Sequence, residues 1–78
     1  MRDAIANSLA AGYNSVEFAF KDKTAYDNAF SNLIESGSMY NLITAANSRV
    51  SSPYRVDPTT VQYAMDEHNL ILRFFFSR

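Results

Sequence analysis

The C-terminal segment Leu70–Phe76 constrains the fold more than any other, because apolar side chains fill it almost without interruption. Successive side chains of a β-strand point to opposite faces of the sheet. One face of a strand here would carry Leu70, Leu72, Phe74 and Phe76, and the other would carry Ile71, Arg73 and Phe75. An antiparallel strand with one solvated face normally has polar residues on that face. We therefore expect this strand either to be covered by helices on both faces or to offer one face to a partner.

The chain is short and has few means of reinforcing its fold. With 78 residues, it is expected to form a single domain over residues 1–78 that buries about 60–65% of the surface of the unfolded chain. Domains of this size often rely on disulfides, a structural metal or self-association. The sequence has no cysteine and a single histidine, His68, which excludes disulfides and the usual zinc sites. Self-association is the means that remains.

The first segments of the chain predict a helix followed by a strand. A short helix is expected over residues 2–11, ending at Gly12, which suits a left-handed C-terminal cap. Its apolar stripe consists mainly of Ile5 and Leu9, so we expect it to pack lightly or at an edge. Residues 15–21 then alternate between apolar and mostly polar side chains, which predicts a strand with one buried face.

A second helix is indicated between Thr24 and Gly37, where apolar residues recur at intervals of three and four. Thr24 is the expected N-cap, and Gly37 is placed to end the helix. Residues 39–46 continue with a helical stripe that Ser38 is placed to cap, although the residue types there also suit a short strand.

Residues 58–68 allow two interpretations. Asp57 and Pro58 resemble the start of a helix. The alternation of apolar residues from Val61 to Met65 instead favours a strand, which would turn through residues 66–69 into the C-terminal strand. We favour this hairpin. The expected fold class is α+β: a small antiparallel sheet of about three strands, including the C-terminal hairpin, packed against two or three helices.

No stretch of the sequence carries a catalytic or cofactor signature. His68 lies beside Asp66 and Glu67, but adjacent residues in a turn point in different directions, so a solvated loop is the simpler interpretation. There is no nucleophile elbow, and two glycines cannot build a phosphate-binding loop. We expect no enzymatic activity and no catalytic, metal-binding or cofactor-binding residues.

The net charge of −1 and the absence of a block of either sign argue against nucleic acid as a partner. An alternative is a single-stranded nucleic-acid-binding protein that stacks bases on four aromatic side chains, Phe18, Phe20, Phe74 and Phe76. No apolar run is long enough to span a bilayer and the N-terminus does not resemble a secretory signal, so we expect no membrane partner and a cytoplasmic location.

By elimination, the sequence predicts a non-enzymatic protein–protein interaction module. One version of this hypothesis is a virus- or phage-encoded factor that binds and inhibits or redirects a host protein, and a third possibility is a structural assembly subunit. The expected partner-binding residues are Tyr54 and Arg55 in a proline-containing loop, and Ile71, Arg73 and Phe75 on the outer face of the last strand. The simplest partner is a second copy of the chain, in which case Arg73 would need a carboxylate such as Glu17 or Glu67 across the contact.

Overall fold

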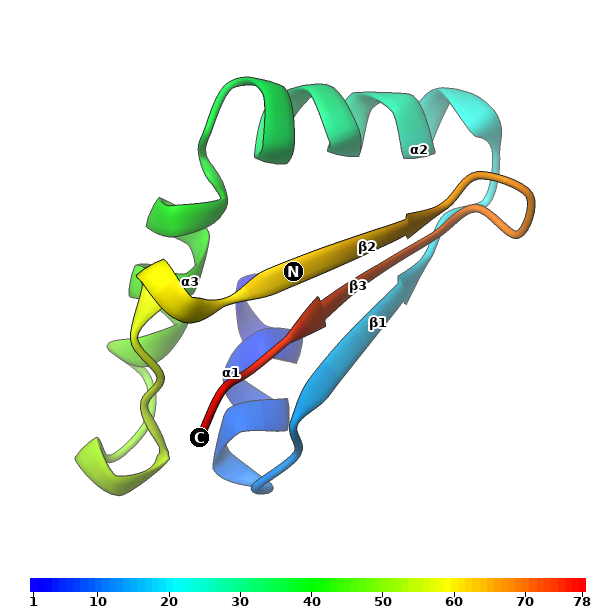
Figure 1. Cartoon of the computed structure of the whole chain (residues 1–78). Coiled ribbons are helices and arrows are strands. Elements are labelled where there is room, and N and C mark those ends of the chain that lie inside the picture. The colour runs from blue at the N-terminus through cyan, green and yellow to red at the C-terminus, as the bar shows by residue number, and fades with distance from the viewer.

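A computed structural model describes residues 1–78 (Figure 1). The helices are α1 (Arg2–Ala10), α2 (Lys23–Ala29), the π-helix η1 (Phe30–Glu35) that continues α2, α3 (Met39–Asn47) and two short 3-10 turns, η2 (Ser52–Tyr54) and η3 (Pro58–Thr60). The strands are β1 (Ser15–Ala19), β2 (Gln62–Asp66) and β3 (Ile71–Phe75). The α+β fold class and the C-terminal hairpin β2–β3 are confirmed.

The three strands form one antiparallel sheet in the order β1-β3-β2, so the C-terminal strand is central. In its middle row, Arg73 pairs with Glu17 on β1 and with Ala64 on β2. Because β3 receives hydrogen bonds from both sides, the last strand of the sequence completes the sheet. Strand β2 begins and ends one residue later than the expected alternation from Val61 to Met65, and β3 is one residue shorter at each end than Leu70–Phe76.

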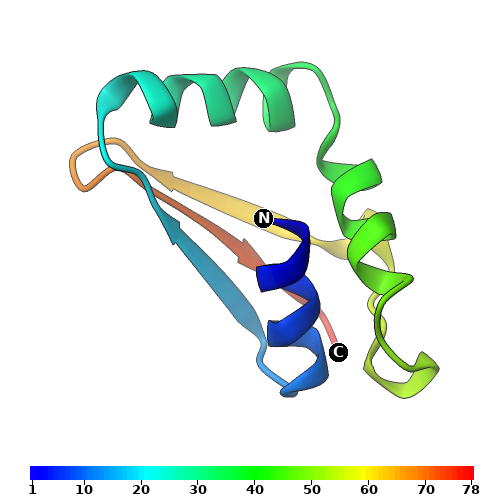
Figure 2. The ribbon, with the colours of Figure 1, turned by 180° about the vertical axis from the view of Figure 1, so that it is seen from behind.

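The hydrophobic core lies on one side of this sheet. Leu72, Phe74 and Phe76 point into it and are buried, in agreement with their shared face in the sequence. Helices α1 and α3 pack against each other behind the strands, as the two opposite views show (Figures 1 and 2). Of the two expected arrangements, the one with helices on both faces is wrong, because the side chains of the opposite face are exposed or only half-buried.

The packing of α1 corrects one expectation from the sequence. Ile5 and Leu9 are fully buried rather than lightly packed, because α1 contacts both α3 and β1 and its short stripe is enclosed between them. The end of the helix is as expected. Gly12 adopts a positive φ of 81°, and the next residue, Tyr13, donates its N–H to the carbonyl of Ser8 at 3.0 Å.

The second helix begins earlier than expected. Its N-cap is Asp22, whose carboxylate accepts a hydrogen bond from the N–H of Ala25 at 2.8 Å, and not Thr24. Asp22 has the extended backbone that an N-cap requires, while Thr24 already lies within the helix. The π-helical continuation over Phe30–Glu35 has no counterpart in the expectations from the sequence. Gly37, with φ of 75°, follows its end.

The two ambiguous segments are resolved. Residues 39–47 form a helix, although Ser38 does not cap it with its side chain. The helical signal at Asp57 and Pro58 is real but local, because it produces only the 3-10 turn η3, in which the Asp57 carboxylate accepts from the N–H of Thr59 at 2.9 Å. The chain then enters β2, so the hairpin interpretation of residues 58–68 is correct.

Candidate protein-interaction surface

One face of the sheet has no helix over it, and we call it the open face. Antiparallel register places three rows of side chains on it, one from each strand in every row. The outward-pointing residues are Ser15, Glu17, Ala19, Gln62, Ala64, Asp66, Ile71, Arg73 and Phe75. The sequence identified its central column, Ile71, Arg73 and Phe75, as one group, and the structure keeps these three together.

Phe75 is the most distinctive member of the open face. Its side chain is 40% exposed, whereas its neighbour Phe74 on the opposite face is fully buried. Ile71 at the other end of the column is half-buried. Exposed single apolar residues are common on protein surfaces, but here Phe75 and Ile71 share a face with Ala19 and Ala64. The open face is therefore mixed: these four apolar residues lie among five polar or charged ones, Ser15, Glu17, Gln62, Asp66 and Arg73.

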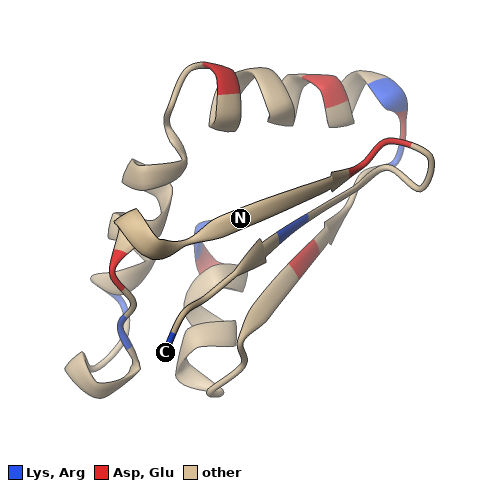
Figure 3. Cartoon of the chain, viewed as in Figure 1, with Lys and Arg blue, Asp and Glu red and all other residues tan.

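In the middle row of the open face, Arg73 forms an ion pair with Glu17 on the adjacent strand. In Figure 3, a basic position on β3 (blue) lies beside an acidic position on β1 (red). In a dimer, Arg73 was expected to need a carboxylate such as Glu17 or Glu67 from the second copy. Within a single chain it already pairs with Glu17. The other candidate, Glu67, pairs with Lys23 at 3.0 Å instead.

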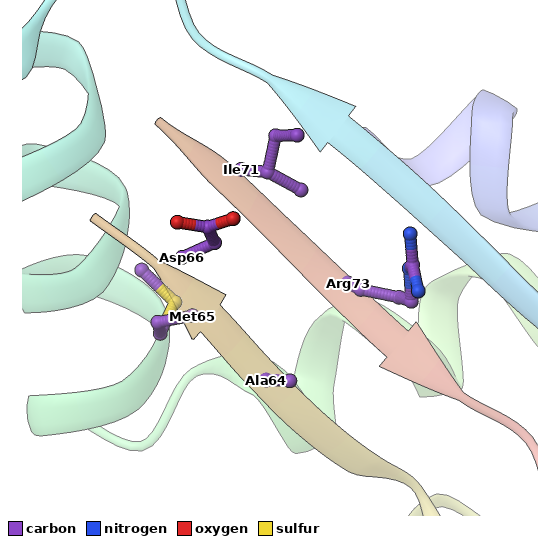
Figure 4. A pocket seen from close by; sticks show the side chains of 5 residues that line it. All are labelled: Ala64, Met65, Asp66, Ile71 and Arg73. Atoms are coloured by element: carbon purple, nitrogen blue, oxygen red, sulfur yellow. The ribbon is translucent and has the colours of Figure 1, made fainter. Parts of the chain in front are cut away.

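A shallow hollow lies on the open face between β2 and β3. Figure 4 shows the side chains of Ala64, Asp66, Ile71 and Arg73 around it. Its volume is about 140 Å³, well below the ~300–1,000 Å³ of typical small-molecule sites. The hollow can accept one protruding side chain of a partner and is too small for a cofactor.

The loop residues Tyr54 and Arg55 do not join the open face. The turn η2, which contains Tyr54, lies beyond the end of α3 and away from the strands in both views (Figures 1 and 2). The Tyr54 side chain is 45% exposed. Arg55 donates from Nε to the carbonyls of Asn47 and Val50, at 3.0 Å each. Its guanidinium therefore binds the carbonyl of the last residue of α3 and that of Val50 in the turn that follows, a role within the fold.

The aromatic residues considered for base stacking lie on the helix-covered side. Phe18 contacts Phe74 edge to face with ring centroids 6.0 Å apart, and Phe20 contacts Tyr26 at 6.2 Å. Phe74 and Phe76 are buried. The stacking surface that the nucleic-acid alternative requires is thus occupied by core packing. Positive and negative residues are scattered over the fold (Figure 3).

The titratable residues of the hairpin loop are engaged locally. The side chain of Asn69 donates to Asp66 at 2.8 Å, and its N–H donates at 3.1 Å; these hydrogen bonds lower the pKa of the Asp66 carboxyl. His68 is exposed in the same loop. No group of three or more histidine, aspartate and glutamate side chains is placed to hold a metal ion.

The members of the open face on β1 and β2 were not among the partner-binding residues predicted from the sequence. Alternation along residues 15–19 already placed Glu17 and Ala19 opposite the buried side chains. What the sequence did not contain was the strand order, which brings Glu17 next to Arg73. None of the helices combines the length and the apolar character needed to cross a bilayer. No family model, curated protein or solved structure matches this chain.

Proposed function

We propose that this protein is a non-enzymatic protein–protein interaction module that binds its partner through the open face of the sheet. The observation that supports the proposal is the exposure of Phe75 and Ile71 on a central strand whose opposite face is fully buried. Interfaces are enriched in aromatic residues and arginine at their centres. The open face offers both, with Arg73 already neutralised by Glu17.

A second copy of the chain is the partner that this surface fits most simply. In a face-to-face dimer with a two-fold axis parallel to the strands and between β1 and β3, each β1 lies over the β3 of the other copy. Glu17 of each copy then lies over Arg73 of the other, since these residues share a row. Phe75 lies over Ser15, and Ile71 over Ala19. The charges are therefore complementary in this arrangement, and Ile71 meets the apolar side chain of Ala19.

The expected association is weak. A sheet of three five-residue strands is small beside a standard interface of ~800 Å² per partner. We expect a dissociation constant of about 10 µM or higher. Sedimentation velocity over about 10–500 µM protein tests this, with a mass that rises from one chain towards two.

The decisive variant is Phe75→Asp, with Tyr13→Asp as its matched control. Both residues are exposed aromatics, at 40% and 63%, but Tyr13 lies outside the open face. Phe75→Asp should keep its circular dichroism and lose association, while Tyr13→Asp should associate like the unmodified chain. A single-chain mass over the whole range would exclude the second copy as partner.

The wider proposal is tested by affinity capture with the same pair of variants. A protein that the unmodified chain and Tyr13→Asp retain, and that Phe75→Asp loses, would be a partner of the open face. Equal retention by all three chains would contradict the proposed surface. Inhibition of a host protein, a viral origin and a role as an assembly subunit stay hypotheses from the sequence.

A further inference from the structure

The outer edge of β2 has backbone groups with no partner. In the β1–β3 ladder, Phe20 donates its N–H to Leu70 and Phe76 donates to Asn14, at 2.9 and 2.8 Å. Hydrogen-bonded pairs alternate along an antiparallel ladder, so the even-numbered residues of β3 face β1 and the odd-numbered residues face β2.

The register then fixes which groups of β2 point outward. Ile71, Arg73 and Phe75 of β3 are opposite Asp66, Ala64 and Gln62. These three residues of β2 point their backbone groups inward, so Tyr63 and Met65 point theirs out of the sheet. No residue of the chain hydrogen-bonds to the N–H or C=O of Tyr63 or Met65 from that side.

Two hollows flank this edge on the helix-covered side, and we call them together the edge groove. One, of about 280 Å³, lies beside Tyr63 and is lined by residues that include Leu33, Ile34, Met39 and Tyr40. The other, of about 220 Å³, lies beside Met65, with Tyr26 and Phe30 among its lining residues. The helical segment α2–η1 therefore forms the wall opposite β2.

The spacing of the two hollows matches an extended chain. Tyr63 and Met65 are two residues apart on one strand, which corresponds to ~6.8 Å, the distance between side chains on the same face of a strand. A strand added beside β2 would place two alternate side chains at these hollows. The π-helix contributes to both, with Phe30 at one and Leu33 and Ile34 at the other. Irregular π segments of this kind often occur at functional sites.

Charge at one end of the edge groove indicates a basic residue in the occupant. Asp27 and Glu67 line the hollow beside Met65. One cation, Lys23, pairs with Asp27 at 2.8 Å and with Glu67 at 3.0 Å. Two carboxylates against one ammonium leave this end with a net negative charge.

The other free edge of the sheet lacks these features. By the same alternation, β1 points the backbone groups of Ser15, Glu17 and Ala19 outward. No hollow on the molecule is lined by a residue of β1. The edge of β1, a free edge without hollows, therefore serves as the control for substitutions at the edge of β2.

We infer that the edge groove binds an extended segment of a partner protein, which adds to the sheet as a strand beside β2. The segment carries large apolar side chains at two positions two residues apart, and Lys or Arg at the end near Asp27 and Glu67. Main-chain hydrogen bonds to Tyr63 and Met65 supply affinity, and the hollows supply specificity. This inference rests on the proposed function of protein binding but uses a surface separate from the open face.

The probe is a synthetic peptide, acetyl-Lys-Thr-Phe-Thr-Leu-Thr-Lys-amide, titrated into ¹⁵N-labelled protein. We expect chemical-shift changes at Tyr63, Met65, Phe30 and Ile34, with slower hydrogen exchange of the Tyr63 and Met65 amides. The control peptide, acetyl-Lys-Phe-Thr-Thr-Leu-Thr-Lys-amide, has the same composition with its apolar residues on opposite faces. It should bind at least about tenfold more weakly.

Three variants locate the binding site. Met65→Pro removes an outward N–H from β2 and should weaken peptide binding at least about tenfold. Glu17→Pro removes an outward N–H from β1 and should change the affinity for the peptide less than about twofold. Ile34→Glu places a charge in one hollow and should also weaken binding, which keeps the test valid if a proline variant does not fold. Phe75→Asp should leave peptide binding unchanged.

Several results would overturn the inference. These are the absence of shift changes at about 1 mM peptide, equal binding of the two peptides, or shift changes confined to Ile71, Arg73 and Phe75. A dimer that Met65→Pro disrupts and Phe75→Asp does not would show that a second copy occupies the edge, which also contradicts it. If peptide binding fails, the proposed function of the open face still stands, because that proposal is tested separately by the association of the Phe75→Asp variant.

Discussion

Arg73 on the central strand forms an ion pair with Glu17 on β1, at the middle of a sheet face that no helix covers. Both side chains are nearly half exposed, at 46% and 43%. If Arg73 had no carboxylate partner, a protein bound over this face would bury an unpaired charge, which costs free energy. Because the pair is complete within one chain, a partner can cover this face without supplying a carboxylate.

The ion pair should contribute little to stability in the free protein. Solvent screens a pair this exposed, so we expect a coupling energy below about 1 kcal/mol between the two residues. A double-mutant cycle with Glu17→Gln, Arg73→Gln and the double variant, measured by urea unfolding, gives this energy. A coupling above about 2 kcal/mol would mean that the pair is shielded from solvent in solution.

Phe74 and Phe75 should respond very differently to the same truncation. Phe74→Ala removes a fully buried ring and is expected to lower the free energy of unfolding by about 3–5 kcal/mol, enough to unfold much of a domain this small. Phe75→Ala removes a ring that is 40% exposed and should cost less than about 1 kcal/mol. Thermal unfolding of the two variants side by side measures the contrast. Similar losses would mean that the open face is covered in the folded protein.

The contrast between these two rings is also what the sequence predicted best. Alternation along residues 70–76 separated the buried side chains from Arg73 and Phe75 before any pairing was known. The burial of Ile5 and Leu9 was underestimated, because it depends on α3, which is distant in the sequence. The strand order could not be predicted from the sequence either. The Arg73–Glu17 pair and the free edge of β2 both depend on that order, so they could not be predicted.

The start of α2 separates two residues that the sequence could not distinguish. Asp22 and Thr24 are both good N-cap types, but only Asp22 accepts a hydrogen bond from a helical N–H, that of Ala25. Asp22→Ala should therefore destabilise the protein by about 1 kcal/mol, whereas Thr24→Ala should change the free energy of unfolding by less than about 0.5 kcal/mol. Chemical denaturation of both variants measures this. The reverse order would move the N-cap to Thr24.

Acid should weaken the fold through two hydrogen-bonded aspartates. The backbone N–H and hydroxyl of Thr59 lower the pKa of Asp57, and the Asn69 side chain and N–H lower that of Asp66, from an ordinary value of 3.8. The unfolded chain therefore binds protons first as the pH falls, and the stability from these groups is lost below about pH 4. The double variant Asp57→Asn, Asp66→Asn should show a smaller fall in the urea midpoint between about pH 5 and about pH 3 than the unmodified chain. An unchanged fall would assign the acid sensitivity to other carboxylates.

Asn47 should be the most sensitive polar residue of the fold. Its amide nitrogen donates to the carbonyl of Val56 at 2.7 Å, and its amide oxygen accepts from the N–H of Val56 at 3.0 Å. Val56 is buried, so Asn47→Ala would leave a backbone donor and acceptor without partners, each at about 1–3 kcal/mol. We expect a loss of at least about 2 kcal/mol in the free energy of unfolding.

The matched control for this prediction is Asn41→Ala, an exposed position on the same helix. It should change the free energy of unfolding by less than about 0.5 kcal/mol. Asn47→Asp keeps the acceptor for the Val56 N–H and loses the donor to its carbonyl, so its effect should lie between those of the two alanine variants. Hydrogen exchange of the Val56 amide adds a local measurement: Asn47→Ala should accelerate it more than Asn47→Asp does. Equal rates in both variants would show that Asn47 does not hold the loop after α3 in place.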